Sequence, residues 1–257
     1  MLIRQESKLK RRKYIQRARF FLERLKAASG VAQAMKYLHE KKIVFRDLKP
    51  ENVGVTKGTF VLFDFGLSRY LTDSDRVVGN SDDQYYSTGL TGSRLFMAPE
   101  VARSKPYGFS ADVFSFAILF WEVMSLQEVF PSMNVSKHFR SVIIKGRRPA
   151  SIANILTSEL NDMMKDSWAD NPLKRPSFDS ICQTLTQNVR EVEMNIRQKS
   201  SSLPNLQSMF GSSAEGFKSS TLDDSGAIDN NYDGGDEKCR NSNLLSPRSL
   251  FRKKKGR

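Results

Sequence analysis

The sequence has 257 residues, of which 39% are hydrophobic, so it is long and apolar enough for one large or two small domains with a real core. Its formal net charge of +13 is concentrated at the two ends, and the middle is closer to balance. The longest strongly apolar run, Val113 to Trp121, is far shorter than the ~20 residues that a membrane span needs. A chain disordered throughout and a membrane-spanning protein are both excluded.

The first residues of the chain and its cysteines indicate in which cellular compartment the protein is located. Charged residues follow Met1–Arg4 directly, without the apolar region of a secretory signal. Cys182 and Cys239 are the only cysteines, and Cys239 lies in a polar tail, so we expect two free thiols and neither a disulfide framework nor a zinc site. A cytoplasmic or nuclear protein is expected.

Basic side chains gather at both ends of the chain. They are Arg4, Lys8, Lys10, Arg11, Arg12, Lys13, Arg17 and Arg19 at the start, and Arg248, Arg252, Lys253, Lys254, Lys255 and Arg257 at the finish. Such runs attract nucleic acid, anionic lipid or a nuclear import receptor. Neither cluster alternates basic and aromatic residues as a stacking platform requires, so the sequence favours solvated surfaces over a nucleic-acid interface.

Residues 1–18 are basic and show no strand pattern, so we expect a separate segment there. From Ala18 to about His39, apolar residues recur at spacings of three and four, which predicts an amphipathic helix. A polar, turn-prone segment follows at 45–52. Residues 53–63 then read as a short hairpin around the turn 56–58.

The second half of the sequence predicts mainly helices. The polar stretch from Ser68 to Ser93 is expected to be a long functional loop. Residues 110–124 are apolar nearly all round, which predicts a buried central helix beginning at Ser110. Further helices are expected at 135–144, from 157 or 158, and after Ser177. Residues 198–257 are expected to be a disordered polar tail ending in basic residues.

Several short motifs occur in a definite order. Asp47, Lys49 and Asn52 place a carboxylate, an ammonium and a carboxamide close together, and Asp64-Phe65-Gly66 follows. Beyond these stand Ala98-Pro99-Glu100, Asp112 in the apolar helix, Trp168, and Arg175-Pro176. The set resembles the eukaryotic protein kinase family, of the serine/threonine type and the tyrosine-kinase-like branch. The resemblance covers residues 19–197 and implies the large C-terminal lobe of an α+β fold, predominantly helical here, with one short β-hairpin.

The resemblance implies phosphoryl transfer from ATP to a serine or threonine of a protein substrate. Asp47 would accept or orient the proton of the acceptor hydroxyl, and Lys49 would neutralise the moving phosphate. Asn52 and Asp64 would supply oxygen ligands to Mg²⁺. Taken singly, Asp47 and Asn52 are also common turn residues, but the full motif set favours the catalytic interpretation.

The resemblance also implies regulatory and structural residues. Arg46 and Arg69 would bind a phosphate placed by an upstream kinase on one of three hydroxyls of the loop, Ser87, Thr88 or Thr91. The alternative is that both arginines pair with acids such as Asp82 or Asp83. Ser93 matches a hydroxyl that contacts the catalytic aspartate and lysine. Glu100 with Arg175 would form a buried ion pair, and Asp112 would accept hydrogen bonds from the catalytic-loop backbone.

The sequence departs from the family at four matched positions and in two missing motifs. Phe45 stands in place of the usual histidine, Gly54 in place of a bulkier residue under the adenine, and Phe114 and Ala117 in place of tryptophan and glycine. Neither Gly-x-Gly-x-x-Gly nor a Val-Ala-x-Lys strand occurs, so the lobe that holds ATP is expected to be missing. We therefore expect an incomplete serine/threonine kinase domain, inactive as an isolated chain. The alternative is a non-catalytic kinase-like binding or scaffold module.

Overall fold

The computed structural model describes residues 2–77, 84–86 and 88–201 of the chain. The α-helices are α1 (Leu2–Glu40), α2 (Pro99–Ala102), α3 (Ser110–Ser125), α4 (Val135–His138), α5 (Ser158–Ser167) and α6 (Phe178–Ser201). The strands are β1 (Ile43–Val44), β2 (Val53–Thr56), β3 (Thr59–Leu62) and β4 (Arg69–Tyr70). Short 3₁₀ turns lie at η1 (Pro50–Asn52), η2 (Phe65–Leu67), η3 (Asp73–Asp75) and η5 (Pro172–Lys174), and η4 (Phe139–Ile144) is a π-helix.

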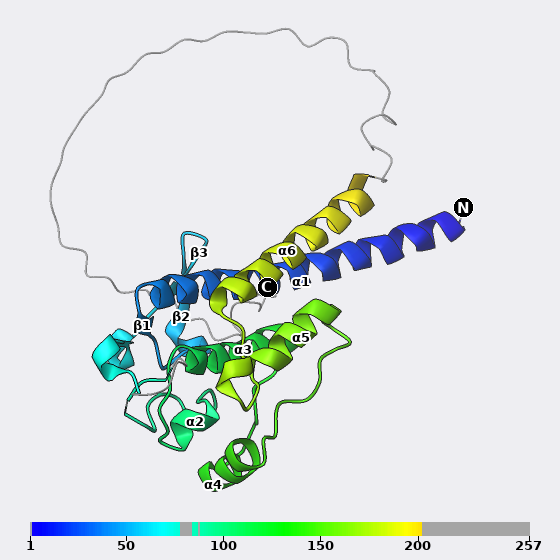
Figure 1. Ribbon diagram of the computed structural model, residues 1–257. Helices are drawn as coiled ribbons and strands as arrows, with labels where there is room; N and C mark the ends of the chain where they lie inside the picture. The colour runs from blue at the N-terminus through cyan, green and yellow to red at the C-terminus, as the bar shows by residue number, and fades with distance from the viewer. Residues whose placement is uncertain (1, 78–83, 87, 202–257) are drawn as a thin grey trace, which may run out of the picture.

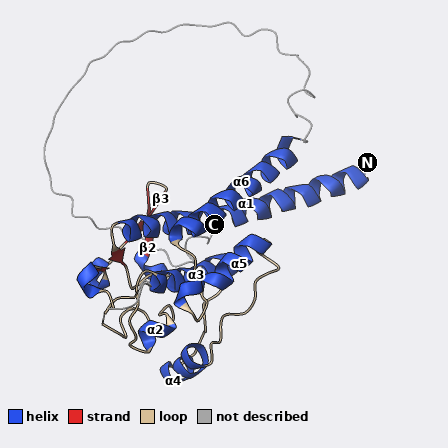
Figure 2. Ribbon diagram, in the orientation of Figure 1, coloured by secondary structure: helices blue, strands red, loops and turns tan. Residues whose placement is uncertain are grey.

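Helices dominate the structure: α3 packs against α1 and α5, and α6 lies along α1 (Figure 1). Every residue of α3 from Ala111 to Met124 is buried, which confirms the predicted central helix. Side chains of α1, including Leu25 and Met35, pack into the same core. Colouring by secondary structure shows how little strand accompanies these helices (Figure 2). The apolar circumference of α3 therefore has partners on all sides, as burial of its side chains requires.

The strands form two small antiparallel sheets. β2 and β3 make the hairpin that the sequence predicts, with Gly54 opposite Val61. β1 and β4 pair as well, with Val44 opposite Arg69, and this second pairing was not predicted. β1 leads into the polar segment 45–52 and β4 follows Asp64-Phe65-Gly66, so the pairing holds these two motifs together at their outer ends.

The first helix begins well before the expected start near Ala18, because α1 runs from Leu2. Its first half packs on the end of α6, where Ile15 and Leu22 form a small apolar cluster with Ile196. The ammonium group of Lys199 also lies 3.6 Å from the centre of the Tyr14 ring. This partner is distant in sequence, so the periodicity of residues 1–18 alone could not indicate the longer helix.

Other predicted elements are found with altered detail. The helix expected at 135–144 is divided into α4 and the π-helix η4, and the stretch 68–93 contains β4 and η3 as well as loop. Helices α5 and α6 lie where they were expected. Most of the predicted tail 198–257 lies outside the described residues, although α6 continues to Ser201. Within the described part of the chain, no helix is long and apolar enough to cross a membrane.

Candidate active site

The polar segment 45–52 is held in place by one buried carboxylate. Asp112 lies in the first turn of α3 and is 0% exposed. Its Oδ2 accepts a hydrogen bond from the backbone N–H of Phe45 at 2.8 Å, and its Oδ1 accepts one from the N–H of Arg46 at 2.8 Å. His39 Nε2 lies 2.9 Å from Oδ2. The carboxylate thus supports the loop at a point where Arg46 adopts a positive φ of 71°, an uncommon conformation for a non-glycine residue.

Four side chains predicted to act in catalysis or support it converge beyond this point. Lys49 Nζ lies 2.8 Å from Asp47 Oδ2 and 2.8 Å from Ser93 Oγ. The backbone N–H of Ser93 donates to Asp47 Oδ1 at 2.7 Å. Asn52 Nδ2 donates to the carbonyl of Asp47 at 2.8 Å and to its Oδ2 at 3.0 Å. The structure therefore brings Asp47, Lys49, Asn52 and Ser93 into one hydrogen-bonded group.

Gly92 allows Ser93 to lie close enough to contact Asp47 and Lys49. Its φ is +103°, and a Cβ built there would lie 2.2 Å from the carbonyl oxygen of Arg46. Any side chain at this position would therefore push Ser93 away from the catalytic loop.

The carboxylate of Asp47 is kept ionised by its neighbours. Burial pushes the pKa of Asp47 upward, but hydrogen bonds from Lys49 and Ser93, together with the charge of Lys49, outweigh burial and hold this pKa below its ordinary value. Asp47 is 6% exposed, so these contacts are little weakened by solvent. An ionised carboxylate at neutral pH can accept a proton or a hydrogen bond.

Asp64 follows the hairpin, and a backbone hydrogen bond holds this end of the hairpin at Asn52. The N–H of Phe63 donates to the carbonyl of Asn52 at 2.9 Å, so the residue before Asp64 is tied to the catalytic loop. Asp64 has a φ of 57°, and its Oδ1 accepts a hydrogen bond from Gly66 N at 3.2 Å. Positive φ at a non-glycine residue is frequent at functional sites.

The two predicted Mg²⁺ ligands have suitable donor atoms. The amide nitrogen of Asn52 is directed at Asp47, which leaves its carbonyl oxygen as the acceptor, and Asp64 is exposed. No group of three or more acidic, histidine or cysteine side chains within the described residues could hold a metal by itself. Mg²⁺ usually takes one or two protein oxygens and completes its shell with phosphate and water, so Asn52 and Asp64 fit this ion.

The two arginines predicted to bind phosphate have different partners. Arg46 Nη1 donates to Thr88 Oγ1 at 3.1 Å, and the Thr91 hydroxyl donates to the carbonyl of Thr88 at 3.0 Å. Arg69 Nη2 is instead 2.5 Å from Asp75 Oδ1. Ser87, Asp82 and Asp83 lie outside the described residues. The structure thus places Arg46 at a candidate hydroxyl and Arg69 at an acid that the sequence did not single out.

Most of this chain matches one known protein family. The family model described as "Protein kinase domain" matches residues 5–185. The chain belongs to the eukaryotic protein kinase family. The match covers the segment that holds Asp47, Lys49, Asn52, Asp64, Ser93 and Asp112, and it begins inside the first half of α1.

Curated relatives of this kinase chain are about one-third identical to it over the residues that align. A probable LIM domain-containing serine/threonine-protein kinase of Dictyostelium discoideum is 36% identical over 166 residues, which are 64% of this chain and 16% of that protein. Serine/threonine-protein kinase STY17 of Arabidopsis thaliana is 35% identical, over 68% of this chain and 29% of its own length. Dual specificity protein kinase shkB of Dictyostelium discoideum is 35% identical, over 60% and 23%. The chain therefore spans less than a third of these relatives.

Phe45, the residue in place of the usual histidine, packs against another aromatic ring of this kinase chain. Phe45 is 0% exposed, and its ring centre lies 5.3 Å from that of Phe65 in an edge-to-face arrangement. The Ser68 hydroxyl donates to the carbonyl of Phe45 at 3.3 Å. The Asp64-Phe65-Gly66 segment is therefore attached to the catalytic loop through a ring contact and a main-chain acceptor.

Gly54 has a partner that the sequence interpretation missed. A Cβ built on Gly54 would lie 2.1 Å from the ring of Phe63, so this ring occupies the space of the absent side chain. Phe63 remains 38% exposed and precedes Asp64 directly. The pairing of Gly54 with Val61 makes Phe63 its diagonal neighbour on the same face, which is the signal that could have revealed it.

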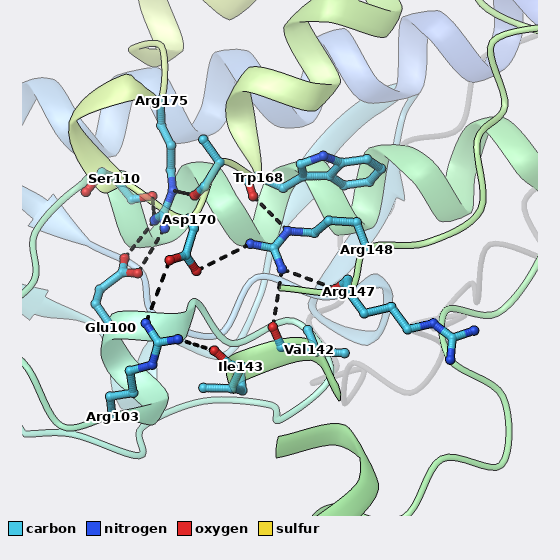
Figure 3. A network of polar contacts seen from close by, with 11 residues as sticks. Glu100, Arg103, Ser110, Val142, Ile143, Arg147, Arg148, Trp168, Asp170 and Arg175 are labelled. Carbon is cyan, nitrogen blue, oxygen red and sulfur yellow. Dashed lines mark hydrogen bonds and ion pairs between the residues drawn. The ribbon is translucent and has the colours of Figure 1, made fainter. Parts of the chain in front are cut away.

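A buried ion pair lies at the centre of a network of polar contacts in this kinase fold (Figure 3). Arg175 Nη1 lies 2.7 Å from Glu100 Oε1, and Nη2 lies 2.9 Å from Oε2. Arg175 also donates to the carbonyls of Ala169 and Ser110, both at 2.9 Å. Arg103 and Arg148 approach Asp170 at 3.9 and 3.8 Å beside the pair. Arg175, which follows η5, thus joins α2 to the start of α3 and to the segment between α5 and η5.

Proposed function

We propose that residues 19–197 are the large lobe of a protein serine/threonine kinase, which transfers the γ-phosphate of ATP to Ser or Thr hydroxyls of a protein substrate. The observation that carries this proposal is the contact of Lys49 Nζ with both Asp47 and Ser93 at 2.8 Å. Lysine two positions after the catalytic aspartate is typical of serine/threonine kinases. We further propose a cytoplasmic or nuclear location and no nucleic-acid partner.

The proposed roles follow from charge and hydrogen bonding. ATP with Mg²⁺ supplies the phosphoryl group and shields its charge. Asp47 is ionised, so it can orient the acceptor hydroxyl and accept its proton. Lys49 places a positive charge beside this carboxylate, where negative charge develops on the transferred group. Asn52 and Asp64 would hold the metal ion.

We propose that the 257-residue chain does not catalyse this transfer by itself. It contains neither Gly-x-Gly-x-x-Gly nor Val-Ala-x-Lys, the motifs that cover and contact the phosphates of ATP. Isothermal titration of this chain with Mg-ATP should therefore show no micromolar binding. Micromolar binding that is abolished by Asp64→Asn would contradict this expectation.

A non-catalytic binding module is the second candidate. Phe45 and the missing motifs favour it, because Phe45 cannot donate the side-chain hydrogen bond of the usual histidine. Incubation of the full-length natural protein with ATP and a general protein substrate separates the two candidates. Phosphoserine and phosphothreonine in the substrate support the kinase, and their absence supports the binding module.

We propose that an upstream kinase activates the protein by phosphorylating Thr88. The Thr88 hydroxyl already lies 3.1 Å from Arg46 Nη1, so a phosphate there would gain charge-assisted hydrogen bonds with little movement. Arg46 directly precedes Asp47 in the catalytic loop, and its backbone N–H donates to Asp112. A phosphate on Thr88 that fixes the position of Arg46 would therefore also fix the neighbouring residue Asp47.

Substitution Thr88→Ala in the full-length protein is expected to lower the peptide phosphorylation rate about tenfold, which corresponds to one lost charge-assisted contact. Phosphatase treatment of the unaltered protein should give the same decrease. Ser136→Ala, at an exposed position of α4, serves as the control and should leave the rate unchanged. Full activity of the Thr88→Ala protein would assign the regulation to another hydroxyl.

A further inference from the structure

The first half of α1 and the end of α6 extend side by side beyond the other helices (Figure 1). The apolar cluster of Ile15, Leu22 and Ile196 joins them, and the Arg11 side chain donates a hydrogen bond to the carbonyl of Lys199. Ser201, the last residue of α6, therefore lies beside this half of α1. Residues 202–257 follow from this point.

These two helix ends carry an excess of positive charge. Residues 9–22 and 194–201 contain six and two basic residues, respectively, and no aspartate or glutamate. Seven of these basic side chains are exposed, and they form no ion pair with another described residue. We call these seven the basic surface: Lys10, Arg12, Lys13, Arg17, Arg19, Arg197 and Lys199.

The next basic residue toward the body of the protein shows what these side chains lack. Lys26 Nζ lies 2.7 Å from Glu193 Oε1, so α6 provides a carboxylate at that level. Beyond Glu193, α6 provides none. Residues 9–22 span about 20 Å of helix, and charges interact over a Debye length of ~8–10 Å at ordinary salt. The basic surface is therefore self-repelling and would be stabilised by an acidic segment placed along it.

One segment of this chain has the matching composition. Residues 219–237 contain six carboxylates and no lysine, arginine or histidine, although the whole chain has a formal charge of +13. The carboxylates are Asp223, Asp224, Asp229, Asp233, Asp236 and Glu237. Residues 202–218 connect this segment to Ser201 and can extend over roughly 55–60 Å. The segment can therefore reach every side chain of the basic surface.

We propose that residues 219–237 bind to the basic surface of α1 and α6 within the same chain. Each exposed ion pair is weak, so the contact depends on several pairs at once. The attachment at Ser201 supplies the rest, because it holds the acidic segment at a high local concentration beside the surface. An external polyanion or an anionic membrane then reaches the basic surface only by displacing the segment. This inference does not depend on the proposed phosphoryl transfer.

Energy transfer between two dyes on the 257-residue chain measures the contact. Cys239 stands two positions after Glu237, whereas Cys182 is buried and burial raises the pKa of its thiol to about 11, so a maleimide dye at pH 7 reacts at Cys239. Gln16→Cys supplies the second site, at an exposed position of α1 within the basic surface. Transfer should be efficient at low salt and should decrease at about 1 M NaCl, where the Debye length is ~3 Å.

Charge variants identify the two partners. Replacement of the six carboxylates by amides should lower the low-salt transfer efficiency to its value in about 1 M NaCl. The triple variant Arg12→Glu, Lys13→Glu and Arg17→Glu should cause the same loss. Adding Asp223→Lys, Asp229→Lys and Asp233→Lys to this triple variant should restore the transfer, a result that misfolding cannot produce.

Two controls separate this contact from general charge effects. Lys57→Glu, Lys105→Glu and Lys145→Glu change the same charge at exposed positions outside α1 and α6, and should leave the transfer efficiency unchanged. Removal of residues 248–257, whose basic side chains compete for the same carboxylates, should keep or raise it.

Transfer that does not respond to the acidic residues, or a loss that the three Asp→Lys changes fail to restore, would overturn the inference. Vesicles of phosphatidylserine and phosphatidylcholine test the other occupant of the surface. The six-amide variant should bind them more tightly than the unaltered chain, because its basic surface is uncovered. Equal binding of the two proteins would contradict the inference and assign the surface to an external anionic partner.

Discussion

Replacement of Asp47 by asparagine in the full-length protein should lower the phosphorylation rate by about 10²–10⁴-fold. The amide is nearly the same size but cannot take a proton from the acceptor hydroxyl. It also cannot carry the negative charge that pairs with Lys49 Nζ at 2.8 Å. The backbone anchors of the loop to Asp112 do not involve the Asp47 side chain, so the loop should remain in place.

The rate should be measured as phosphate transfer to a serine-containing peptide, with thermal unfolding measured in parallel. Asp162→Asn is the matched control, since it makes the same change on the exposed face of α5, where the Asp162 side chain is 69% exposed. Equal activity of the wild-type and Asp47→Asn proteins would show that the observed transfer comes from a contaminating kinase. That result would favour the non-catalytic binding module.

Substitution Arg175→Ala should lower the free energy of unfolding by about 3–5 kcal/mol. The Arg175 side chain is 0% exposed and that of Glu100 is 7% exposed, so removal of the guanidinium leaves a buried carboxylate without its partner. The carbonyls of Ala169 and Ser110 lose their donor in the same step. The cost reflects this unpaired state and is larger than the net stabilisation by the intact pair.

Urea unfolding of the 257-residue chain measures this loss. Lys165→Ala provides the comparison, because its pair with Asp162 is 3.9 Å long and exposed and should contribute no more than about 1 kcal/mol. Glu100→Ala should lower the free energy of unfolding by a similar amount, since it leaves the buried guanidinium of Arg175 without its partner. A loss below about 1 kcal/mol for Arg175→Ala would show that solvent or another group replaces the arginine.

Local sequence signals predicted those parts of the fold whose partners are close in sequence. The apolar circumference of residues 110–124 indicated a buried helix, and α3 is that helix. Two short β-prone runs around Gly58 indicated the hairpin of β2 and β3. The order of the motifs indicated the protein kinase family, to which the chain belongs.

Contacts between distant segments account for what the sequence interpretation missed. The two-residue pairing of β1 with β4 is too short to leave a periodic pattern. The early start of α1 depends on α6, which lies at the other end of the described chain.

The amino-acid sequence by itself determined which chemical groups this protein carries: the carboxylates of Asp47 and Asp64, the ammonium of Lys49 and the amide of Asn52. The tertiary structure decided their arrangement, because Ser93 reaches Lys49 across the loop and Asp112 supports the loop from α3. Residue type is a property of the chain, whereas a hydrogen bond of 2.8 Å between distant residues depends on how all the intervening segments pack.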